Sequence, residues 1–159
     1  MSSNTLSNMI RAAVIAVTLC GIAGCLYILP STGTNLAVKN PGLAHCYYPW
    51  LIFLWIAAIP CFAILIVVWK VSSSVKQEAV FTYKTARRVK ISAVLLFGDT
   101  CFFIAGNTVF LLLGMSHPFV LLISLFIAAF GVSLAILAAT LSRFLTKAAV
   151  LQEEADSTI

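Results

Sequence analysis

Residues 50–69 read WLIFLWIAAIPCFAILIVVW, twenty consecutive residues without a charged side chain and with a tryptophan at each end. A transmembrane helix needs about 20 mostly apolar residues to cross the hydrocarbon core. Tryptophan is enriched where such helices meet the lipid headgroups. This stretch therefore predicts a membrane-spanning helix, which Pro60 should kink because proline removes one backbone hydrogen bond.

Three further stretches have the same apolar character, at residues 10–29, 91–115 and 119–141. Of the 159 residues, 62% are hydrophobic and only 9% are charged, whereas about 25% of a typical soluble domain is charged. Since lipid offers no hydrogen bonds to the backbone, each stretch should be helical. The sequence predicts a single all-α domain, residues 1–159, built as an integral membrane four-helix bundle.

The connections between these spans differ in charge. The inner loop, residues 70–90, contains six of the basic residues, whereas the outer loop, residues 30–49, contains Lys39 alone. Loops rich in lysine and arginine stay in the cytoplasm. We therefore expect both termini, including a tail at residues 142–159, to be cytoplasmic. Because topology accounts for the net charge of +5, we expect no direct binding of nucleic acid.

Small side chains recur at helical spacing on three of the spans, which favours close helix contacts in lipid. The same stripes suit packing within one chain or a homo-oligomer interface, and the sequence does not separate the two. On the first span they are Ala12, Ala16, Cys20 and Gly24, on the third Gly98, Gly106 and Gly114, and on the fourth Gly131, Ala135, Ala138 or Ala139, and Ser142.

The inner loop should be partly ordered. Thr82 is a suitable cap for a helix that begins near Tyr83 and runs into the third span. The fourth helix should likewise continue to about Leu151, before an acidic tail. These two segments give a candidate surface for a cytoplasmic partner, formed by Lys84, Arg87, Arg88, Lys90, Glu153 and Glu154.

Asp99 is the only acidic residue inside a predicted span, about 12 Å along the helix from Ile91. A charge at that depth costs at least about 2.5–3.5 kcal/mol, so the carboxyl must be protonated, paired or hydrated. Thr18 and Ser133 lie at similar depth and are candidate hydrogen-bond partners, with Asn107 as a further intramembrane polar residue. We favour a contact that fixes helix register over a proton or cation site, because transport pathways usually contain several ionisable groups.

Other side chains raise the question of a metal. His45, Cys46 and His117 all fall on the predicted outer side, where they could converge as a metal or haem site or titrate as a pH sensor. Three cysteines at similar depth, Cys20, Cys61 and Cys101, would suit Cu(I), but cysteine also serves as a small apolar side chain. We predict no metal and no cofactor. No nucleophile–base pair, zinc spacing or phosphate-binding glycine loop is evident, so we expect no enzyme activity.

Several short motifs occur in a recognisable order and spacing. They are Tyr47-Tyr48-Pro49, Ala58-Ile59-Pro60, Phe81-Thr82 before the basic segment 84–90, and the ending at residues 154–159. Together they resemble the DUF2975 family, bacterial four-helix membrane proteins of unknown function. The resemblance implies no assigned activity. Members of that family are often encoded beside a small helix-turn-helix regulator, which implies a partner of that kind.

The leading hypothesis is a non-enzymatic sensor or regulator in the bacterial cytoplasmic membrane. It would be surrounded by the lipid bilayer and would present its inner loop and tail to a cytoplasmic partner. One alternative is a small proton- or cation-coupled transporter that uses Asp99. Another is an immunity or membrane-stress protein.

Overall fold

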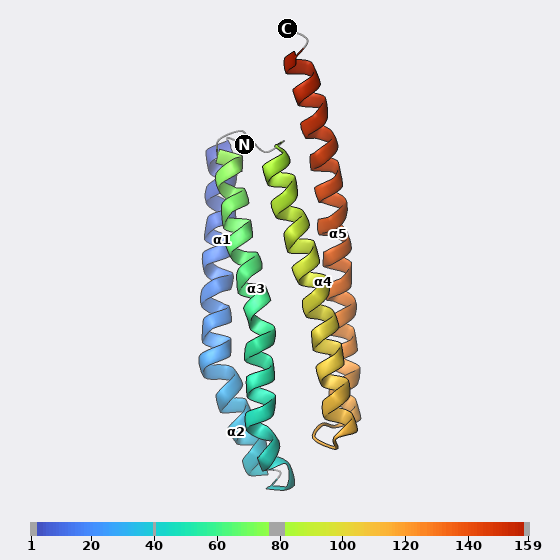
Figure 1. Cartoon of the computed structure of the whole chain (residues 1–159). Coiled ribbons are helices and arrows are strands. Elements are labelled where there is room, and N and C mark those ends of the chain that lie inside the picture. The colour runs from blue at the N-terminus through green and yellow to red at the C-terminus, as the bar shows by residue number, and fades with distance from the viewer. Residues whose placement is uncertain (1–2, 40, 77–81, 158–159) are drawn as a thin grey trace.

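The computed structural model describes residues 3–39, 41–76 and 82–157. All regular structure in these residues is helical (Figure 1), which confirms the predicted all-α class. Parts of the predicted inner loop and tail, at 77–81 and 158–159, lie outside the described residues. The elements are α1 (Ser3–Ala23), a π-helical turn (Gly24–Ile28), α2 (Leu29–Lys39), a 3₁₀ helix (Pro41–Cys46), α3 (Tyr47–Lys76), α4 (Tyr83–Leu112) and α5 (Pro118–Ser157).

Four helical stretches are long and apolar enough to cross a membrane: Asn4–Lys39, Ala44–Val75, Tyr83–Leu112 and Pro118–Ala155. Large apolar side chains on them point outward. Phe126 and Phe130, for example, are 72% and 69% exposed. Surfaces of this kind are stable in lipid and not in water, so the chain is a membrane protein with four spanning helices.

The helices pack in the order α1, α3, α4, α5, side by side (Figure 1). Within the described residues α1 packs mainly on α3, α5 packs mainly on α4, and α3 and α4 join the two pairs. The predicted bundle is therefore more open than expected, because α1 and α5 each have one main neighbour. Most of their remaining surface is left to lipid.

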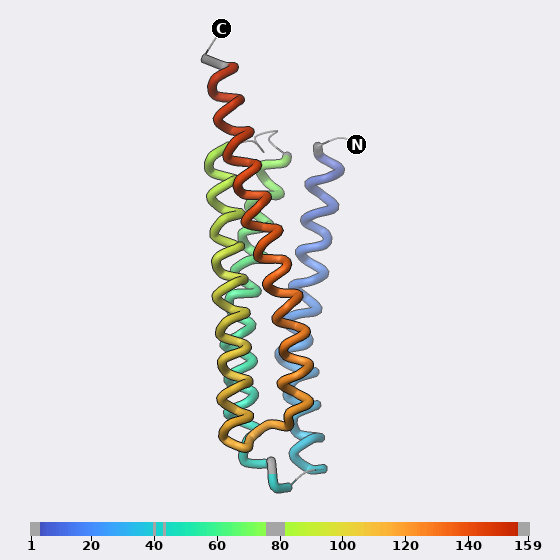
Figure 2. The backbone as a smooth tube through the Cα atoms, turned by 90° about the vertical axis from the view of Figure 1, so that its right-hand side faces the viewer, coloured from blue at the N-terminus to red at the C-terminus, as the bar shows by residue number. Residues whose placement is uncertain are grey.

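The start of α1, the end of α3, the start of α4 and the end of α5 all lie at one end of the molecule (Figures 1 and 2). We call this the basic end, because it carries Arg11, Lys70, the segment 84–90, Arg143 and Lys147. The arrangement agrees with an even number of spans. The side of the membrane that the basic end faces stays a prediction.

The first helix does not end at Leu29, before Pro30, as the predicted span 10–29 and outer loop 30–49 imply. The helix widens into the π-helical turn, where the backbone N–H of Leu29 donates to the carbonyl of Gly24, and then continues as α2 to Lys39. Pro30 has no N–H, so in this five-residue register the carbonyl of Cys25 loses its backbone donor. The indole Nε1–H of Trp55 on α3 donates to that carbonyl at 3.0 Å. A side chain from the neighbouring helix thus replaces the bond that proline removes.

The turn between α4 and α5 is short. Helix α4 ends at Leu112 rather than at the predicted Met115, because Gly114 adopts φ +68°, a left-handed conformation suited to glycine. His117 then caps α5, since its Nδ1 accepts a hydrogen bond from the backbone N–H of Phe119 at 3.2 Å. Gly114 therefore belongs to the turn and not to a packing stripe.

Helix α5 is 40 residues long, or about 60 Å, and its last turns project beyond the other helices (Figures 1 and 2). Leu145 is its last buried residue among those described. The segment expected to be an acidic tail is helical through Ser157. The continuation past Leu151 therefore goes further than the sequence suggested.

Small residues form the contact between α4 and α5. Gly131 lies so close to Thr100 that an added Cβ would come within 2.5 Å of the Thr100 Oγ1. Both helices bury residues seven positions apart, a spacing typical of left-handed packing. We call this contact the small-residue seam; its buried members are Ala86, Ala93, Thr100 and Asn107 on α4, and Ser124, Ala128, Ala135 and Ser142 on α5.

The stripe predicted on the first span does not pack within the chain, and its use in a homo-oligomer stays a prediction. Ala12, Ala16 and Cys20 are exposed, and nothing lies within 4 Å of a Cβ placed on Gly24. The contact with α3 uses another face of α1, with buried Ser7 and Val14 and with Gly21 against the ring of Phe62.

Candidate functional site

Polar contacts between the helices concentrate at the basic end, beginning with a buried pair of serines. The hydroxyl of Ser7 on α1 donates to the carbonyl of Ser72 on α3 at 3.0 Å, and the hydroxyl of Ser72 donates to the carbonyl of Ser7 at 2.9 Å. Both residues are fully buried. The pair therefore fixes the register of α1 on α3 near the membrane surface.

The next serine along α3 holds an arginine. Arg11 donates from a terminal guanidinium nitrogen to the hydroxyl of Ser73 at 3.2 Å. Its guanidinium carbon lies 5.4 Å from the centre of the Trp69 ring, a distance at which a cation is attracted to the ring face. The arginine of the first span thus reaches α3 and does not merely mark the topology.

Ser74 turns toward the opposite helix. Arg88 on α4 donates to the hydroxyl of Ser74 at 3.4 Å and to the carbonyl of Lys70 at 3.3 Å. The three consecutive serines on α3 therefore bond two different helices: Ser72 and Ser73 bond α1, and Ser74 bonds α4.

The same end also links α4 to α5. The hydroxyl of Ser142 donates to the carbonyl of Ala86 at 2.8 Å, and both residues are buried. All four spans are thus joined by hydrogen bonds at the basic end. We call the residues that make these bonds the serine layer: Ser7, Ser72, Ser73, Ser74 and Ser142.

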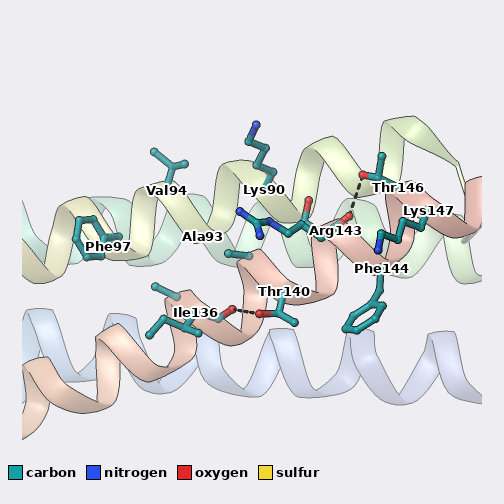
Figure 3. Close-up of a pocket in the computed structure, with 13 residues that line it drawn as sticks. Lys90, Ala93, Val94, Phe97, Ile136, Thr140, Arg143, Phe144, Thr146 and Lys147 are labelled. Atoms are coloured by element: carbon teal, nitrogen blue, oxygen red, sulfur yellow. Dashed lines mark hydrogen bonds between the residues drawn. The ribbon is translucent and has the colours of Figure 1, made fainter.

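A groove of about 820 Å³ runs between α4 and α5 beside this layer (Figure 3). Toward the basic end the groove is lined by Lys90, Arg143 and Lys147. Farther from that end, along the two helices, it is lined by Phe97 and Ile136. A second hollow of about 590 Å³ shares Lys90 and includes Tyr83 and Arg87. The basic end is therefore hollowed as well as positively charged.

The residues predicted to bind a partner lie at this end. Lys84, Arg87 and Lys90 are exposed on the first turns of α4, and Glu153 and Glu154 are exposed on the projecting part of α5. Arg88 is half-buried and holds α3, so its role in the structure differs from that of its neighbours.

The only hydrogen bond described for Asp99 was not anticipated. Its Oδ2 accepts a hydrogen bond from the thiol of Cys61 on α3 at 3.4 Å. Its Oδ1 is buried and has no partner among the described residues. Asp99 therefore links α4 to α3, which agrees with a register contact, and leaves one oxygen unused.

The predicted partners of Asp99 bond within their own helices. Thr18 donates to the carbonyl of Val14 at 2.7 Å, and Ser133 donates to that of Ala129 at 2.8 Å. Asn107 donates to the carbonyl of Phe103 at 2.8 Å. None of the three donates to Asp99 in the described residues, because hydroxyl and amide side chains in a helix readily bond the preceding turn. That they form one intramembrane polar site with Asp99 stays a prediction.

The candidate metal ligands are divided between different roles. The thiol of Cys46 lies 3.2 Å from the Nε2 of His45, whereas His117 caps α5. No cluster of three metal-ligating side chains occurs in residues 3–39, 41–76 and 82–157. Cys20, Cys61 and Cys101 are free thiols, in no disulfide, and all three are exposed on their helices.

Sequence reasoning missed the serine layer. It placed Ser72–Ser74 within the inner loop, residues 70–90, and gave Ser7 no role. A signal was present only for the adjoining small-residue seam, in the seven-residue spacing of Ala86, Ala93 and Thr100. Such a repeat indicates one face of a helix that packs closely along its length.

These features define a multi-pass membrane protein whose helices are linked by hydrogen bonds at one end. The family model described as "Protein of unknown function (DUF2975)" matches residues 31–159. The chain therefore belongs to that family, which confirms the resemblance noted in the sequence.

One curated relative extends the match over most of the chain. The "Uncharacterized membrane protein YoaS" of Bacillus subtilis (strain 168) is 28% identical over 150 residues, which cover 91% of this chain and 94% of YoaS. No solved structure matches the chain. The relative supports a membrane protein and adds no activity.

Proposed function

We propose that the protein is a non-enzymatic regulator of the bacterial cytoplasmic membrane that presents its basic end to a cytoplasmic protein. The observation that carries the proposal is the projection of α5 beyond the other helices (Figure 2). From Leu145 to Ser157 the projecting helix covers about 18 Å. A helix end of this length is not needed to cross the bilayer, so a contact outside it gives the segment a use.

The chemistry of the projecting segment supports a protein contact. Val150 and Leu151 are 47% and 66% exposed, close to the acidic residues Glu153 and Glu154. Lys84 and Arg87 are exposed on the first turns of α4, at the same end of the molecule. A surface that combines apolar side chains with both signs of charge is suited to a protein partner.

The orientation in this proposal comes from charge. Lysine and arginine gather at the basic end, and Lys39 lies near the opposite end. The positive-inside rule then puts both termini in the cytoplasm. The partner class implied by the family resemblance is a helix-turn-helix regulator, which would be held at the membrane or released by a signal.

Co-purification tests this proposal. The full chain in detergent should retain a helix-turn-helix regulator of the kind that the family resemblance implies, and Lys84→Glu should weaken that retention. Lys39→Glu is the matched control, because it makes the same charge change at the other end. Failure of the wild-type protein to retain the regulator, or equal loss with both variants, would contradict the proposal.

A proton- or cation-coupled transporter is the second candidate, favoured by the unpartnered Oδ1 of Asp99. An acidic side chain inside a membrane is a functional candidate by default. Flux in proteoliposomes that is lost in Asp99→Asn and kept in Ser133→Ala would support it. Flux that survives Asp99→Asn unchanged would remove it.

A further inference from the structure

The groove between α4 and α5 combines basic and apolar walls in a fixed order along the helices (Figure 3). Lys90, Arg143 and Lys147 line it near the basic end, and no acidic residue is among its lining residues. Within the described part of the chain these three side chains have no hydrogen-bond partner. The groove therefore carries three cations unpaired within those residues. Lys90 points away from α5 in Figure 3, and its flexible side chain must turn toward α5 to share an anion with Arg143 and Lys147.

The apolar part begins about one or two turns deeper. Phe97 follows Lys90 by seven residues on α4, and Ile136 precedes Arg143 by seven residues on α5, which is about 10 Å along each helix. Both side chains line the same groove. A ligand that fills it must therefore carry its negative charge at one end and an apolar chain at the other.

The hydroxyl groups of the groove are already engaged. Thr140 donates to the carbonyl of Ile136 at 2.9 Å and Thr146 to that of Ser142 at 2.9 Å (Figure 3). Ser142 donates across the seam to Ala86. Recognition is therefore left to the charges of the lysines and the arginine, which suit a phosphate and not a neutral sugar or amide.

From this geometry we propose that the groove binds one anionic phospholipid, with its phosphate at Lys90, Arg143 and Lys147 and an acyl chain against Phe97 and Ile136. The order of charge and apolar surface along α4 and α5 matches the order of phosphate and hydrocarbon in one leaflet. Basic pockets between spanning helices on the cytoplasmic side suit such headgroups. The groove opens beside the exposed Phe144 and Val94, so a lipid can enter from the bilayer.

The proposal does not depend on the cytoplasmic partner. Lys90 belongs to both the groove and the predicted partner surface, but Arg143 and Lys147 belong to the groove alone. Loss of partner binding with intact lipid binding, or the reverse, would distinguish the failure of one proposal from that of the other.

Native mass spectrometry of the full chain in detergent tests the lipid site. Delipidated protein should retain one phosphatidylglycerol per chain in preference to phosphatidylcholine. The double variant Arg143→Gln/Lys147→Gln should bind phosphatidylglycerol at least about tenfold more weakly, since each basic side chain near a membrane surface contributes measurably to binding an anionic lipid. Lys39→Gln/Lys84→Gln removes the same charge outside the groove and should bind like the wild type.

Four results would overturn the proposal. The first is equal weakening in the two double variants, because it would indicate a general charge effect. The second is equal retention of phosphatidylcholine. The third is glycerol phosphate binding as tightly as the lipid, because the apolar part of the groove would then contribute nothing. The fourth is a dimer that disappears in Arg143→Gln/Lys147→Gln, because it would assign the groove to a second copy instead.

A substitution in the apolar part of the groove covers the case in which the double variant does not fold. Val94 lines the groove but is 64% exposed, so the fold should tolerate Val94→Ser. It should weaken binding of long-chain phosphatidylglycerol more than that of a short-chain form. Equal effects on both chain lengths would contradict the assignment of the acyl chain.

Discussion

The hydroxyls of Ser7 and Ser72 each donate to the other residue's backbone carbonyl, at 3.0 and 2.9 Å, across the contact of α1 and α3. Serine hydroxyls in helices usually bond the preceding turn of their own helix. Here both cross to a neighbour, and both residues are fully buried. The contact therefore requires a close and specific approach of the two helices.

Ser72→Ala should lower the free energy of unfolding by about 0.5–1.5 kcal/mol, the range of single hydrogen bonds between spanning helices. The double variant Ser7→Ala/Ser72→Ala should lose less than the sum of the single variants, because the two bonds form one unit. Unfolding in mixed micelles measures both quantities. Ser133→Ala, which removes a bond within one helix, is the control and should have little effect. Additive losses would show that the two serines do not act together.

Arg87 and Arg88 are adjacent in sequence but have different surroundings. Arg88 reaches the end of α3 through Ser74 and Lys70, whereas Arg87 is exposed. Arg88→Gln should lower stability by about 1 kcal/mol, the usual worth of a partly exposed charged hydrogen bond, and Arg87→Gln should leave stability within about 0.5 kcal/mol. Arg87→Gln should instead weaken retention of the cytoplasmic partner. Equal stability losses in the two variants would contradict this division.

Two glycines in the contacts of α4 differ from a third. A Cβ at Gly131 would meet the Oγ1 of Thr100, and a Cβ at Gly106 would meet the ring of Phe53, whereas nothing lies near Gly98. Gly131→Ala and Gly106→Ala should each destabilise the fold by about 1–3 kcal/mol through overpacking. Gly98→Ala should be neutral or slightly stabilising, because alanine favours a helix. Thermal unfolding in detergent ranks the three variants by stability. A Gly98→Ala variant as unstable as Gly131→Ala would contradict the close contact at Gly131 and the open space at Gly98.

Composition was enough to predict four helices, because an apolar run such as 50–69 can cross lipid as a helix, which satisfies its backbone hydrogen bonds internally. Thr82 and Tyr83 likewise marked the start of α4 correctly. Pro30 misled, since its missing N–H is replaced by Trp55 from a helix distant in sequence. Such compensation depends on tertiary contact and leaves no local trace.

Residues that face one another were harder to predict than the helices. Depth along the membrane suggested Thr18 and Ser133 as partners of Asp99, but depth does not fix the direction in which a side chain points. Cys61 occupies the matching face of α3 and donates the bond. The stripe on α1 failed for the same reason, because four-residue spacing selected an exposed face and the contact follows Ser7 and Val14.

The distribution of charge predicts the orientation of the chain. A fluorescent protein that folds only in the cytoplasm should be bright when fused after residue 159, because α5 ends at the basic end. Fused within residues 40–46, between α2 and α3, it should be dark. Alkaline phosphatase, active only outside the cytoplasm, should give the opposite pattern. The reverse result at both positions would invert the topology and remove the proposed cytoplasmic partner.

Trp55 and Pro30 should be coupled energetically. Trp55→Phe replaces the indole by a smaller aromatic ring without the donor to the carbonyl of Cys25, and should lower the unfolding free energy by about 0.6–1.7 kcal/mol. In the Pro30→Ala background a backbone N–H returns, so that carbonyl regains a donor within its own helix. Trp55→Phe should then have a smaller effect, with a coupling of about 0.5 kcal/mol or more. Trp50→Phe, at the start of the same helix, should show no coupling to Pro30→Ala. If Trp55→Phe has the same effect in both backgrounds, the indole does not replace the bond that proline removes.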